Sequence, residues 1–357
     1  MKIKKYIPKF IFKLYHYFLA FLGALIYGFP SSKLKVIGIT GTNGKSTTAN
    51  ICFEVLEKAG FKVALASSIY FKIANEEKVN DLKMTMPGRF KIQQFLREAI
   101  LKKCDYAIIE VTSEGIEQFR HKFINFDIAI FTNLSKEHIE SHGGFDNYKE
   151  AKGKFFKEVK GIHILNKDDQ YFEYFNSFKA NKKITYSILD NADVQAKNIL
   201  TDGNHSEFEI KDIKFNTKLL GEFNVYNIMA AIALGLSQGI DLEICKKGIE
   251  KVEGIPGRMQ KIIEEPFSVF IDYAFTPNAL EKVYKYLNPT IAVLGACGGG
   301  RDKWKRPVLG ELAHKYAKYI IITNEDPYDE DPQKIIDEVG EKAPNCIKIL
   351  DRREAIN

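Results

Sequence analysis

The chain has 357 residues, of which 45% are hydrophobic and 27% charged, and its formal net charge is +6. These values are typical of an ordinary soluble globular protein with room for two domains, and they exclude a disordered or low-complexity chain. The five cysteines form no C-x-x-C pair, which argues against disulfides and zinc ribbons and favours a reducing cytoplasm.

The positive charge is concentrated at the N-terminus, where residues 1–35 contain seven lysines and no acidic residue. The remaining residues therefore carry a net charge of −1, which argues against a nucleic-acid groove. The uncharged run 14–29 is shorter than the roughly 20 residues of a spanning helix, and no A-x-A cleavage site follows it. We expect residues 1–34 to form a basic, aromatic helix. It would lie on a membrane surface, on the protein's own body or on a dimer partner.

Beyond Pro30, strand and helix patterns alternate. Buried parallel strands are expected at 35–39, 106–111, 128–133 and 162–165, with helices at 46–59, 89–102, 147–159 and 225–238, and short strands within 183–220. A linker at 253–259 precedes a second α/β series with strands at 268–274, 290–296 and 319–325. The pattern predicts an α/β fold with a doubly wound domain over 35–256. A Rossmann-like C-terminal domain follows over 257–357, and it looks incomplete because the chain ends where a helix begins.

The segment GITGTNGKSTT (38–48) joins the first strand to the first helix of this series. It resembles the nucleotide-binding loop G-x-x-x-x-G-K-[ST], but only Thr42 and Asn43 separate Gly41 from Gly44. Backbone N–H groups and the helix N-terminus form an anion pocket in such a loop. Lys45 would reach the outer phosphates and the Ser46 hydroxyl would ligate Mg²⁺, which makes the central domain a P-loop-type ATPase domain.

Two polar residues follow neighbouring strands of the predicted sheet, Glu110 at the end of 106–111 and His138 after 128–133. The carboxyl ends of parallel strands line one crevice, so both side chains are candidate Mg²⁺ or Mn²⁺ ligands beside the phosphates. Taken singly, each is better explained by a solvated charge or a loop cap. Lys152 lies fourteen residues after His138 among several other lysines, and its position alone predicts a surface residue.

An ordered series of motifs is similar to the Mur ligases, and most to the MurE type, which adds the third amino acid to UDP-N-acetylmuramoyl-L-alanyl-D-glutamate. The resemblance extends from Lys35 to the last residue. The motifs are GTNGKSTT (41–48), EVTSEGIEQFR (110–120), FTNLSKEHIESHG (131–143), YKEAK (148–152), FNVYNIMAA (223–231), GIPGRM (254–259), DYAFTP (272–277), GGGRDKWKRP (298–307) and DRREAI (351–356).

The resemblance implies a role for each matching residue. The ATP site would comprise Gly41, Thr42, Asn43, Gly44, Lys45, Ser46, Thr47, Asn227, Arg258 and Asp272. Mg²⁺ would be held by Ser46, Glu110, His138 and Lys152, the last as a carbamate, and the catalytic residues would be Lys45, Lys152 and His138. The muramoyl-peptide acceptor would contact Thr85, Thr112, Gln118 and Arg120, and the incoming amino acid Arg301, Glu325, Asp326 and Tyr328.

The activity implied by the resemblance is ATP-dependent amide ligation in peptidoglycan synthesis. The acceptor carboxylate attacks the γ-phosphate of ATP to give an acyl phosphate and ADP. The amine of an amino acid then displaces phosphate and forms the amide. The implied partners are small molecules, with no nucleic acid, and the implied location is the cytoplasm, at the inner face of the plasma membrane if residues 1–34 contact lipid.

The chain departs from the family pattern at several positions. Glu114 and Phe275 replace histidines, and EDPY (325–328) replaces a D-N-P-R motif whose arginine fork holds the second carboxylate of diaminopimelate. Residues 1–34 stand in the place of the family's UDP-binding domain, which admits a lipid-linked acceptor.

Two other interpretations stay open on the sequence alone. One is a ligase on another carboxylate, of the folylpolyglutamate or cyanophycin type. The other is a membrane-associated, non-catalytic homologue that keeps a nucleotide site.

Overall fold

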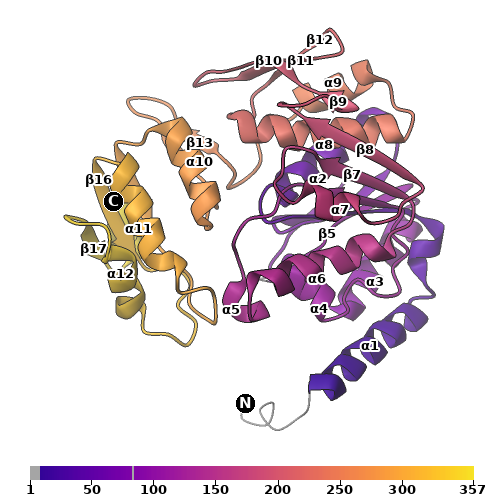
Figure 1. Cartoon of the computed structure of the whole chain (residues 1–357), viewed down its shortest axis with the longest axis horizontal. Helices are drawn as coiled ribbons and strands as arrows, with labels where there is room; N and C mark the ends of the chain where they lie inside the picture. Colours follow the sequence, from indigo (N-terminus) through magenta and orange to yellow (C-terminus); the bar gives the residue numbers. More distant parts are fainter. Residues whose placement is uncertain (1–8, 83) are drawn as a thin grey trace. The chain divides into compact units, whose positions relative to one another are not determined.

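The computed structural model describes residues 9–82 and 84–357. The chain forms two compact units (Figure 1). The first comprises Met1–Leu134 and Lys149–Pro256, and the second comprises Ser135–Tyr148 and Gly257–Asn357. The segment Ser135–Tyr148 thus belongs to the same unit as the C-terminal residues, although the first unit supplies the chain on both sides of it.

The first unit is built on a nine-stranded sheet with the order β4-β3-β2-β5-β1-β6-β7-β8-β9. The strands are β1 (Lys35–Thr40), β2 (Val63–Ala66), β3 (Tyr70–Ile73), β4 (Glu76–Val79), β5 (Tyr106–Glu110), β6 (Ile128–Phe131), β7 (Ile162–Asn166), β8 (Lys182–Ser187) and β9 (Val194–Gln195). All neighbours from β2 to β9 pair in parallel, whereas β3 and β4 form an antiparallel edge. The central strands β1, β5 and β6 are almost wholly buried, as expected for a sheet covered on both faces.

Helices cover both faces of this sheet (Figure 1). They are α1 (Lys9–Ile26), the 3₁₀ turn η2 (Pro30–Lys33), α2 (Lys45–Lys58), α3 (Arg89–Leu101), α4 (Ser113–Glu117), α6 (Phe145–Glu158), α7 (Phe172–Asn176), α8 (Glu222–Ser237) and α9 (Leu242–Glu250). Helix α2 packs on α8 and α9 in the main hydrophobic core, and α8 is buried around most of its circumference because it is apolar on nearly every side. A small antiparallel sheet of β10 (Lys197–Thr201), β11 (Ser206–Ile210) and β12 (Ile213–Thr217) adjoins α9.

The second unit has a parallel sheet of β15 (Ile291–Leu294), β16 (Tyr319–Thr323) and β17 (Ile347–Ile349), and a ribbon of β13 (Gln260–Ile263) and β14 (Val269–Ile271). Its helices are α5 (Ile139–His142), α10 (Pro277–Leu287), α11 (Lys305–Tyr316), α12 (Pro332–Gly340) and α13 (Arg352–Ile356). The side chains of Thr276, Asp331 and Asp351 accept hydrogen bonds from the first turns of α10, α12 and α13, which fixes where these helices begin.

The α/β fold class predicted from the sequence is confirmed, with the large parallel sheet at its centre. The predicted domain ranges 1–34, 35–256 and 257–357 stay a prediction.

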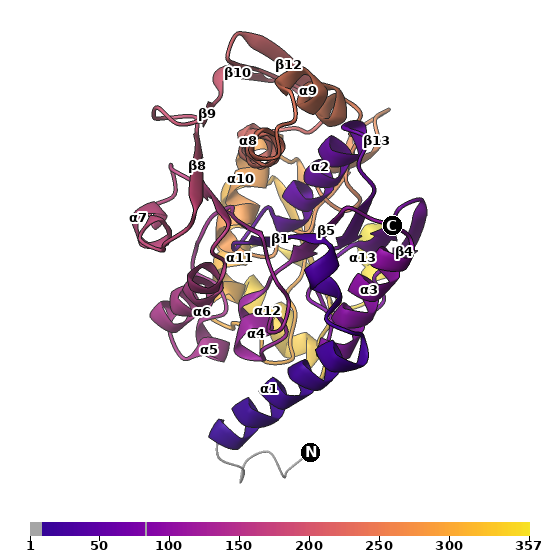
Figure 2. The same ribbon diagram turned by 90° about the vertical axis from the view of Figure 1, so that its right-hand side faces the viewer.

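The N-terminal segment contains helix α1, and residues 1–8 with Lys2, Lys4 and Lys5 lie outside the described residues. The helix packs on α3 through a narrow face at Gly23 and Ala24, and Tyr17 and Phe21 lie against Phe123. Figures 1 and 2 show its first half extending away from the body of the unit. Within residues 9–82 and 84–357, no helix is both long and apolar enough to cross a bilayer.

Candidate active site

The shortened loop is held against the end of β6. The backbone N–H groups of Thr42 and Asn43 donate to the backbone oxygen and Oδ1 of Asn133, at 2.8 and 3.0 Å. A Cβ atom at Gly41 would lie 1.9 Å from Oγ1 of Thr132, so only glycine allows this approach. The loop therefore needs its glycine for contact with a neighbouring strand.

Gly44 and Asn227 meet at the start of α2. Gly44 has φ of 82°, and a Cβ atom there would lie 2.3 Å from Oδ1 of Asn227. The hydroxyl of Thr48, one turn into α2, donates to the same oxygen at 3.2 Å. The structure thus places Asn227, predicted near the nucleotide, directly behind the loop, where it fixes the entry into α2.

Two lysines converge on the carbonyl of Gly41. Nζ of Lys45 donates to the oxygens of Gly41 and Thr42 at 3.0 and 2.8 Å, and Nζ of Lys152 donates to the Gly41 oxygen at 2.9 Å and to Oγ1 of Thr40 at 3.3 Å. Lys152 is only 2% exposed, so it is no surface lysine. Burial, and then the charge of Lys45, holds the pKa of Lys152 well below its ordinary value. The neutral amine that results is the form that reacts with CO₂, which fits a carbamate.

Glu110 and Thr85 are joined through Ser68, a residue that the motifs did not identify. The backbone N–H and the hydroxyl of Ser68 donate to Oε1 and Oε2 of Glu110, at 2.8 and 3.1 Å. The Ser68 hydroxyl also lies 3.0 Å from Oγ1 of Thr85. Glu110 is fully buried, and within the described part of the chain it forms no ion pair. A buried carboxylate with no cationic side chain opposite it fits a metal ligand.

The predicted acceptor residues, which lie in two separate segments of the sequence, come together in the structure. Arg120 donates from Nη1 to the Met86 oxygen at 2.5 Å and from Nη2 to Oε1 of Gln118 at 2.8 Å, which links the Thr85 segment to Gln118. Thr112 has a structural contact as well, because its Oγ1 accepts from the N–H of Gly115 at 3.0 Å and caps α4. Ser46 and Thr47 are buried in the first turn of α2.

His138 lies in the second unit, at the N-cap of α5 with φ of 55°, a left-handed conformation that a non-glycine residue rarely adopts. Asp302 sustains this backbone: its two carboxylate oxygens accept from the N–H groups of Ile139 and Glu140 at 3.1 and 2.9 Å. The side chain of Glu140 in turn accepts from the N–H of Lys303 at 2.8 Å.

A buried ion pair lies beside the same segment. Nζ of Lys305 is 2.6 Å from Oε1 of Glu137, and the two side chains are 5% and 3% exposed. Burial raises the pKa of the Glu137 carboxyl although Lys305 opposes the shift. The Lys305 ammonium also lies 4.8 Å from the ring centroid of Phe275, which stands where the family pattern has histidine. We call these contacts of Asp302, Lys303 and Lys305 with residues 137–140 the 137–305 clasp.

Arg258 and Asp272 lie close to each other in the second unit. Asp272 accepts through Oδ2 from the N–H of Met259 at 2.7 Å, and burial raises the pKa of its carboxyl. The Arg258 guanidinium stacks on Tyr273 at 4.7 Å from the ring centroid.

The predicted amino-acid residues sit on two adjoining loops of the second unit. The N–H of Gly298 donates to the oxygen of Asp326 at 2.8 Å. A Cβ atom at Gly299 would lie 2.7 Å from the Tyr328 ring. The loop that carries Arg301 therefore presses on the loop that carries Glu325, Asp326 and Tyr328 (325–328).

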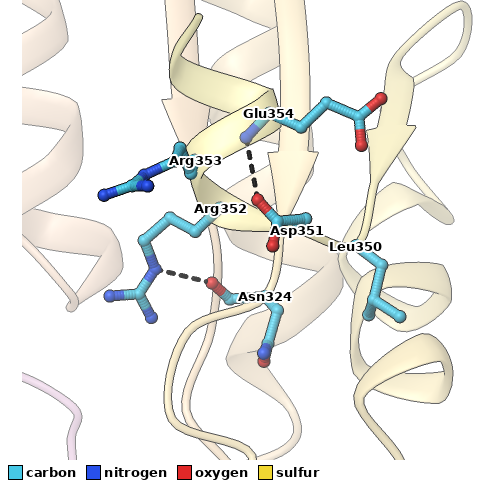
Figure 3. Close-up of a pocket in the computed structure, with 6 residues that line it drawn as sticks. All are labelled: Asn324, Leu350, Asp351, Arg352, Arg353 and Glu354. Carbon is cyan, nitrogen blue, oxygen red and sulfur yellow. Dashed lines mark hydrogen bonds between the residues drawn. The ribbon is translucent and has the colours of Figure 1, made fainter.

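A shallow hollow of about 630 Å³ lies next to the second of these loops (Figure 3). It is lined by Asn324, Leu350, Asp351, Arg352, Arg353 and Glu354. Figure 3 shows the guanidinium groups of Arg352 and Arg353 on the same side, with Nε of Arg352 donating to the Asn324 oxygen at 2.9 Å. None of the predicted site residues lines this hollow.

The strand–loop–helix unit, with Lys45 and Ser46 at the start of α2, defines a nucleotide-binding α/β protein of the P-loop ATPase type. Comparison with known proteins narrows this class. The Mur ligase middle domain matches residues 39–235, and the domain described as "Mur ligase, glutamate ligase domain" matches residues 257–357.

Similar proteins agree with these matches. The chain is 36% identical to a UDP-N-acetylmuramoyl-L-alanyl-D-glutamate--2,6-diaminopimelate ligase of Syntrophomonas wolfei, over 95% of this chain and 72% of the relative. It is 33% identical to a UDP-N-acetylmuramyl-tripeptide synthetase of Roseiflexus sp., over 95% of this chain and 73% of the relative.

Solved structures give the same result. A diaminopimelate ligase structure matches with a TM-score of 0.63 and 30% identity, over 90% of this chain and 69% of that one. Folylpolyglutamate synthase of Mycobacterium tuberculosis complexed with ADP matches with a TM-score of 0.78, over 95% of this chain and 85% of that one. Its identity is only 16%, so it shares the fold. The chain belongs to the Mur ligase family, whose members are ATP-dependent, ADP-forming amide ligases.

Proposed function

We propose that this protein is a MurE-type ligase that adds an amino acid to a UDP-N-acetylmuramoyl dipeptide in peptidoglycan synthesis. The observation that carries the proposal is the buried Lys152, whose Nζ lies 2.9 Å from the carbonyl of Gly41 in the phosphate loop. A scaffold that only held a nucleotide would gain nothing from a buried lysine there, because its desolvation costs stability. The curated relatives named for this reaction support the assignment.

The proposed reaction needs one anion to attack another. An oxygen of the acceptor carboxylate forms a bond to the γ-phosphorus as the bond to ADP breaks, which leaves an acyl phosphate. The amine of the amino acid then forms a bond to the carbonyl carbon, phosphate leaves, and the amine gives up a proton. Lys45 would offset phosphate charge in the first step, and the loop N–H groups would fix the position of the γ-phosphate.

Mg²⁺ belongs to this proposal as well. Ser46, Glu110 and carbamylated Lys152 of the first unit would hold it, and it would supply positive charge at the phosphates. Within the described residues no three His, Cys, Asp or Glu side chains converge, so such a site depends on the Ser46 hydroxyl and the carbamate. The buried Glu110 carboxylate supports it.

The amino acid that we infer lacks a second carboxylate. Arg301 is the one arginine that the motifs place toward the amino acid, and Tyr328 occupies the position of the family's second arginine. Tyr328 adopts φ of 53° and is 55% exposed, and a phenol offers no guanidinium fork. Lysine fits this arrangement better than diaminopimelate does.

The test is ADP release from ATP by the full chain with UDP-N-acetylmuramoyl-L-alanyl-D-glutamate, screened against single amino acids including lysine and diaminopimelate. We expect release that depends on both acceptor and amino acid, with lysine preferred. Release with a folate or a cyanophycin-type acceptor and none with any muramoyl peptide would contradict the proposal. The folylpolyglutamate neighbour does not favour that outcome, because it shares only the fold.

We also propose that the enzyme works in the cytoplasm at the inner face of the plasma membrane, and that residues 1–34 bind anionic lipid there. Phe10, Leu14, Phe18, Phe21 and Leu25 recur at helical spacing on one face of α1, and all five are exposed. No acidic residue lies in the segment, and its lysines complement anionic head groups, each worth roughly 1 kcal/mol near such a surface. A second copy of the chain would bring these like charges together.

Vesicle sedimentation tests this contact. Wild-type protein should bind phosphatidylglycerol vesicles, bind less as salt rises, and bind phosphatidylcholine vesicles weakly. Phe10→Ser/Leu14→Ser/Phe18→Ser should abolish binding, whereas Leu101→Ser/Leu200→Ser, at equally exposed apolar positions outside α1, should not. A dimer in solution that the triple variant dissociates, with no vesicle binding, would contradict the lipid contact.

A further inference from the structure

Two arginines from different elements converge on Gln118. Arg89 is the first residue of α3, and its Nη2 donates to the backbone oxygen of Gln118 at 2.5 Å. Arg120 follows α4, and its Nη2 donates to Oε1 of the same residue at 2.8 Å. Since both guanidinium groups hold one glutamine, two positive charges lie side by side in the first unit.

The carboxylate of Glu114 compensates the charge of Arg120 only in part, because burial still lowers the pKa of Arg120. Within residues 9–82 and 84–357, neither Arg89 nor Arg120 forms an ion pair with an acidic residue, and Nε of each is buried without a hydrogen-bond partner. Burial lowers the pKa of both guanidinium groups. The charge of Arg120 lowers the pKa of Arg89 further, whereas the charge of Glu114 opposes the shift of Arg120. Buried donors left unpaired cost stability, so an arrangement like this one is expected to have an anionic ligand.

The arginine pair connects to the site residues through a short series of contacts. Nη1 of Arg120 donates to the oxygen of Met86 at 2.5 Å, and the neighbouring Thr85 lies 3.0 Å from the Ser68 hydroxyl, which donates to Glu110. The backbone of Arg89 is fixed from the other side, because Gly23 of α1 packs closely on its carbonyl oxygen. An anion bound by the two arginines would therefore be connected to Glu110 through Thr85 and Ser68.

We propose that Arg89, together with Arg120, binds an anionic group of the acceptor and that Arg89 sets acceptor affinity in this chain. The inference rests on the proposed function, since it names a further contact for the same substrate. Arg120 belongs to the motif EVTSEGIEQFR (110–120), whereas Arg89 lies four positions after Thr85 and belongs to none of the motifs. Both a peptide carboxylate and a sugar-linked phosphate have the chemistry that two guanidinium groups recognise.

Steady-state kinetics of Arg89→Gln in the full chain tests the proposal. We expect the KM for UDP-N-acetylmuramoyl-L-alanyl-D-glutamate to rise roughly tenfold or more, with kcat and the KM for ATP nearly unchanged. Arg89→Lys should give an intermediate KM because it keeps the charge and loses the fork. Arg97→Gln is the matched control, an exposed arginine on the same helix, and it should leave all constants unchanged.

Two further arms separate the sources of the anion and the two proposals. If the group is phosphate, inorganic pyrophosphate should raise the melting temperature of wild type and not of Arg89→Gln. If it is carboxylate, glutarate should do so. Acceptor turnover with an unchanged KM in Arg89→Gln would overturn the inference and leave the proposed function standing. Absence of turnover with any muramoyl acceptor would overturn the proposed function, and the inference would then fail as well if neither anion shows Arg89-dependent stabilisation.

Discussion

Lys152 shows how burial changes the chemistry of a residue. In water its amine would be protonated at neutral pH, but desolvation and the nearby Lys45 favour the neutral form. Because only that form takes up CO₂, carbamylation should persist at neutral pH. Acidification should remove it as the amine becomes protonated.

We expect Lys152→Ala to lower kcat by roughly 100-fold or more, as the loss of a charge-stabilising group does elsewhere, with partial rescue by acetate or propionate. Lys157→Ala, an exposed lysine on the same helix, is the control and should keep full activity. Labelled bicarbonate should give a carbamate NMR signal in wild type and in Lys157→Ala, and none in Lys152→Ala. Full turnover by Lys152→Ala would refute the assigned role.

Gly44 gives a second prediction at a single residue. Gly44→Ala should lower the free energy of unfolding for two reasons, a left-handed φ of 82° and a Cβ atom 2.3 Å from Oδ1 of Asn227. Gly60→Ala is destabilising only through its φ of 91°, because nothing lies within 4 Å of its Cβ position. The Gly60 variant should lose about 1–2 kcal/mol in urea unfolding. The Gly44 variant should lose more and also bind ATP weakly, and equal losses would contradict the packing argument.

The sequence could predict side chains that belong to ordered motifs, and it could not predict their supports. Lys45, Glu110 and Arg120 can be recognised because the residues beside them in the sequence form motifs with them. Ser68 and Arg89 belong to no motif. The register of β2 beside β5 positions Ser68, and the start of α3 positions Arg89. Burial of Lys152 was equally hidden, since four lysines between 149 and 157 predict a solvated face.

At the level of elements, the 137–305 clasp joins α5 to the start of α11. Sequence patterns did not predict its ion pair, because Glu137 and Lys305 lie 168 positions apart. The edge strands β3 and β4 and helix α9 were not predicted either, because short or polar segments gain their structure from the neighbouring elements. The apolar strands β1, β5 and β6 were predicted correctly, because an almost continuous run of apolar residues indicates a strand that is buried on both faces.

A prediction for the clasp follows from its burial. Lys305→Met leaves the Glu137 carboxylate buried and unpaired, which should cost about 3–5 kcal/mol in denaturant unfolding. The double variant Glu137→Gln/Lys305→Met should cost clearly less. The folded-state pKa of Glu137 is already raised, so losing Lys305 raises it further. The penalty should therefore shrink as pH falls and the carboxyl becomes protonated. Additive effects of the two substitutions at neutral pH would rule out a coupled pair.

For the whole molecule, the division into two units has a thermodynamic consequence. The main hydrophobic core lies entirely in the first unit, and the second unit buries its own apolar residues, among them Leu309, Ile322 and Ile336. Two separate cores favour two cooperative transitions over one.

We therefore expect calorimetry of the full chain to resolve two transitions, with different responses to nucleotide. The phosphate loop and α2 belong to the first unit, so Mg·ADP should raise the melting temperature of that unit's transition, by mass action worth about 2.7 kcal/mol at a hundred times Kd. Lys45→Ala should remove the shift while both transitions remain. The clasp is confined to the second unit, so Lys305→Met should lower that unit's transition and leave the nucleotide-dependent one in place. A single transition that both substitutions move together would show that the two cores unfold as one.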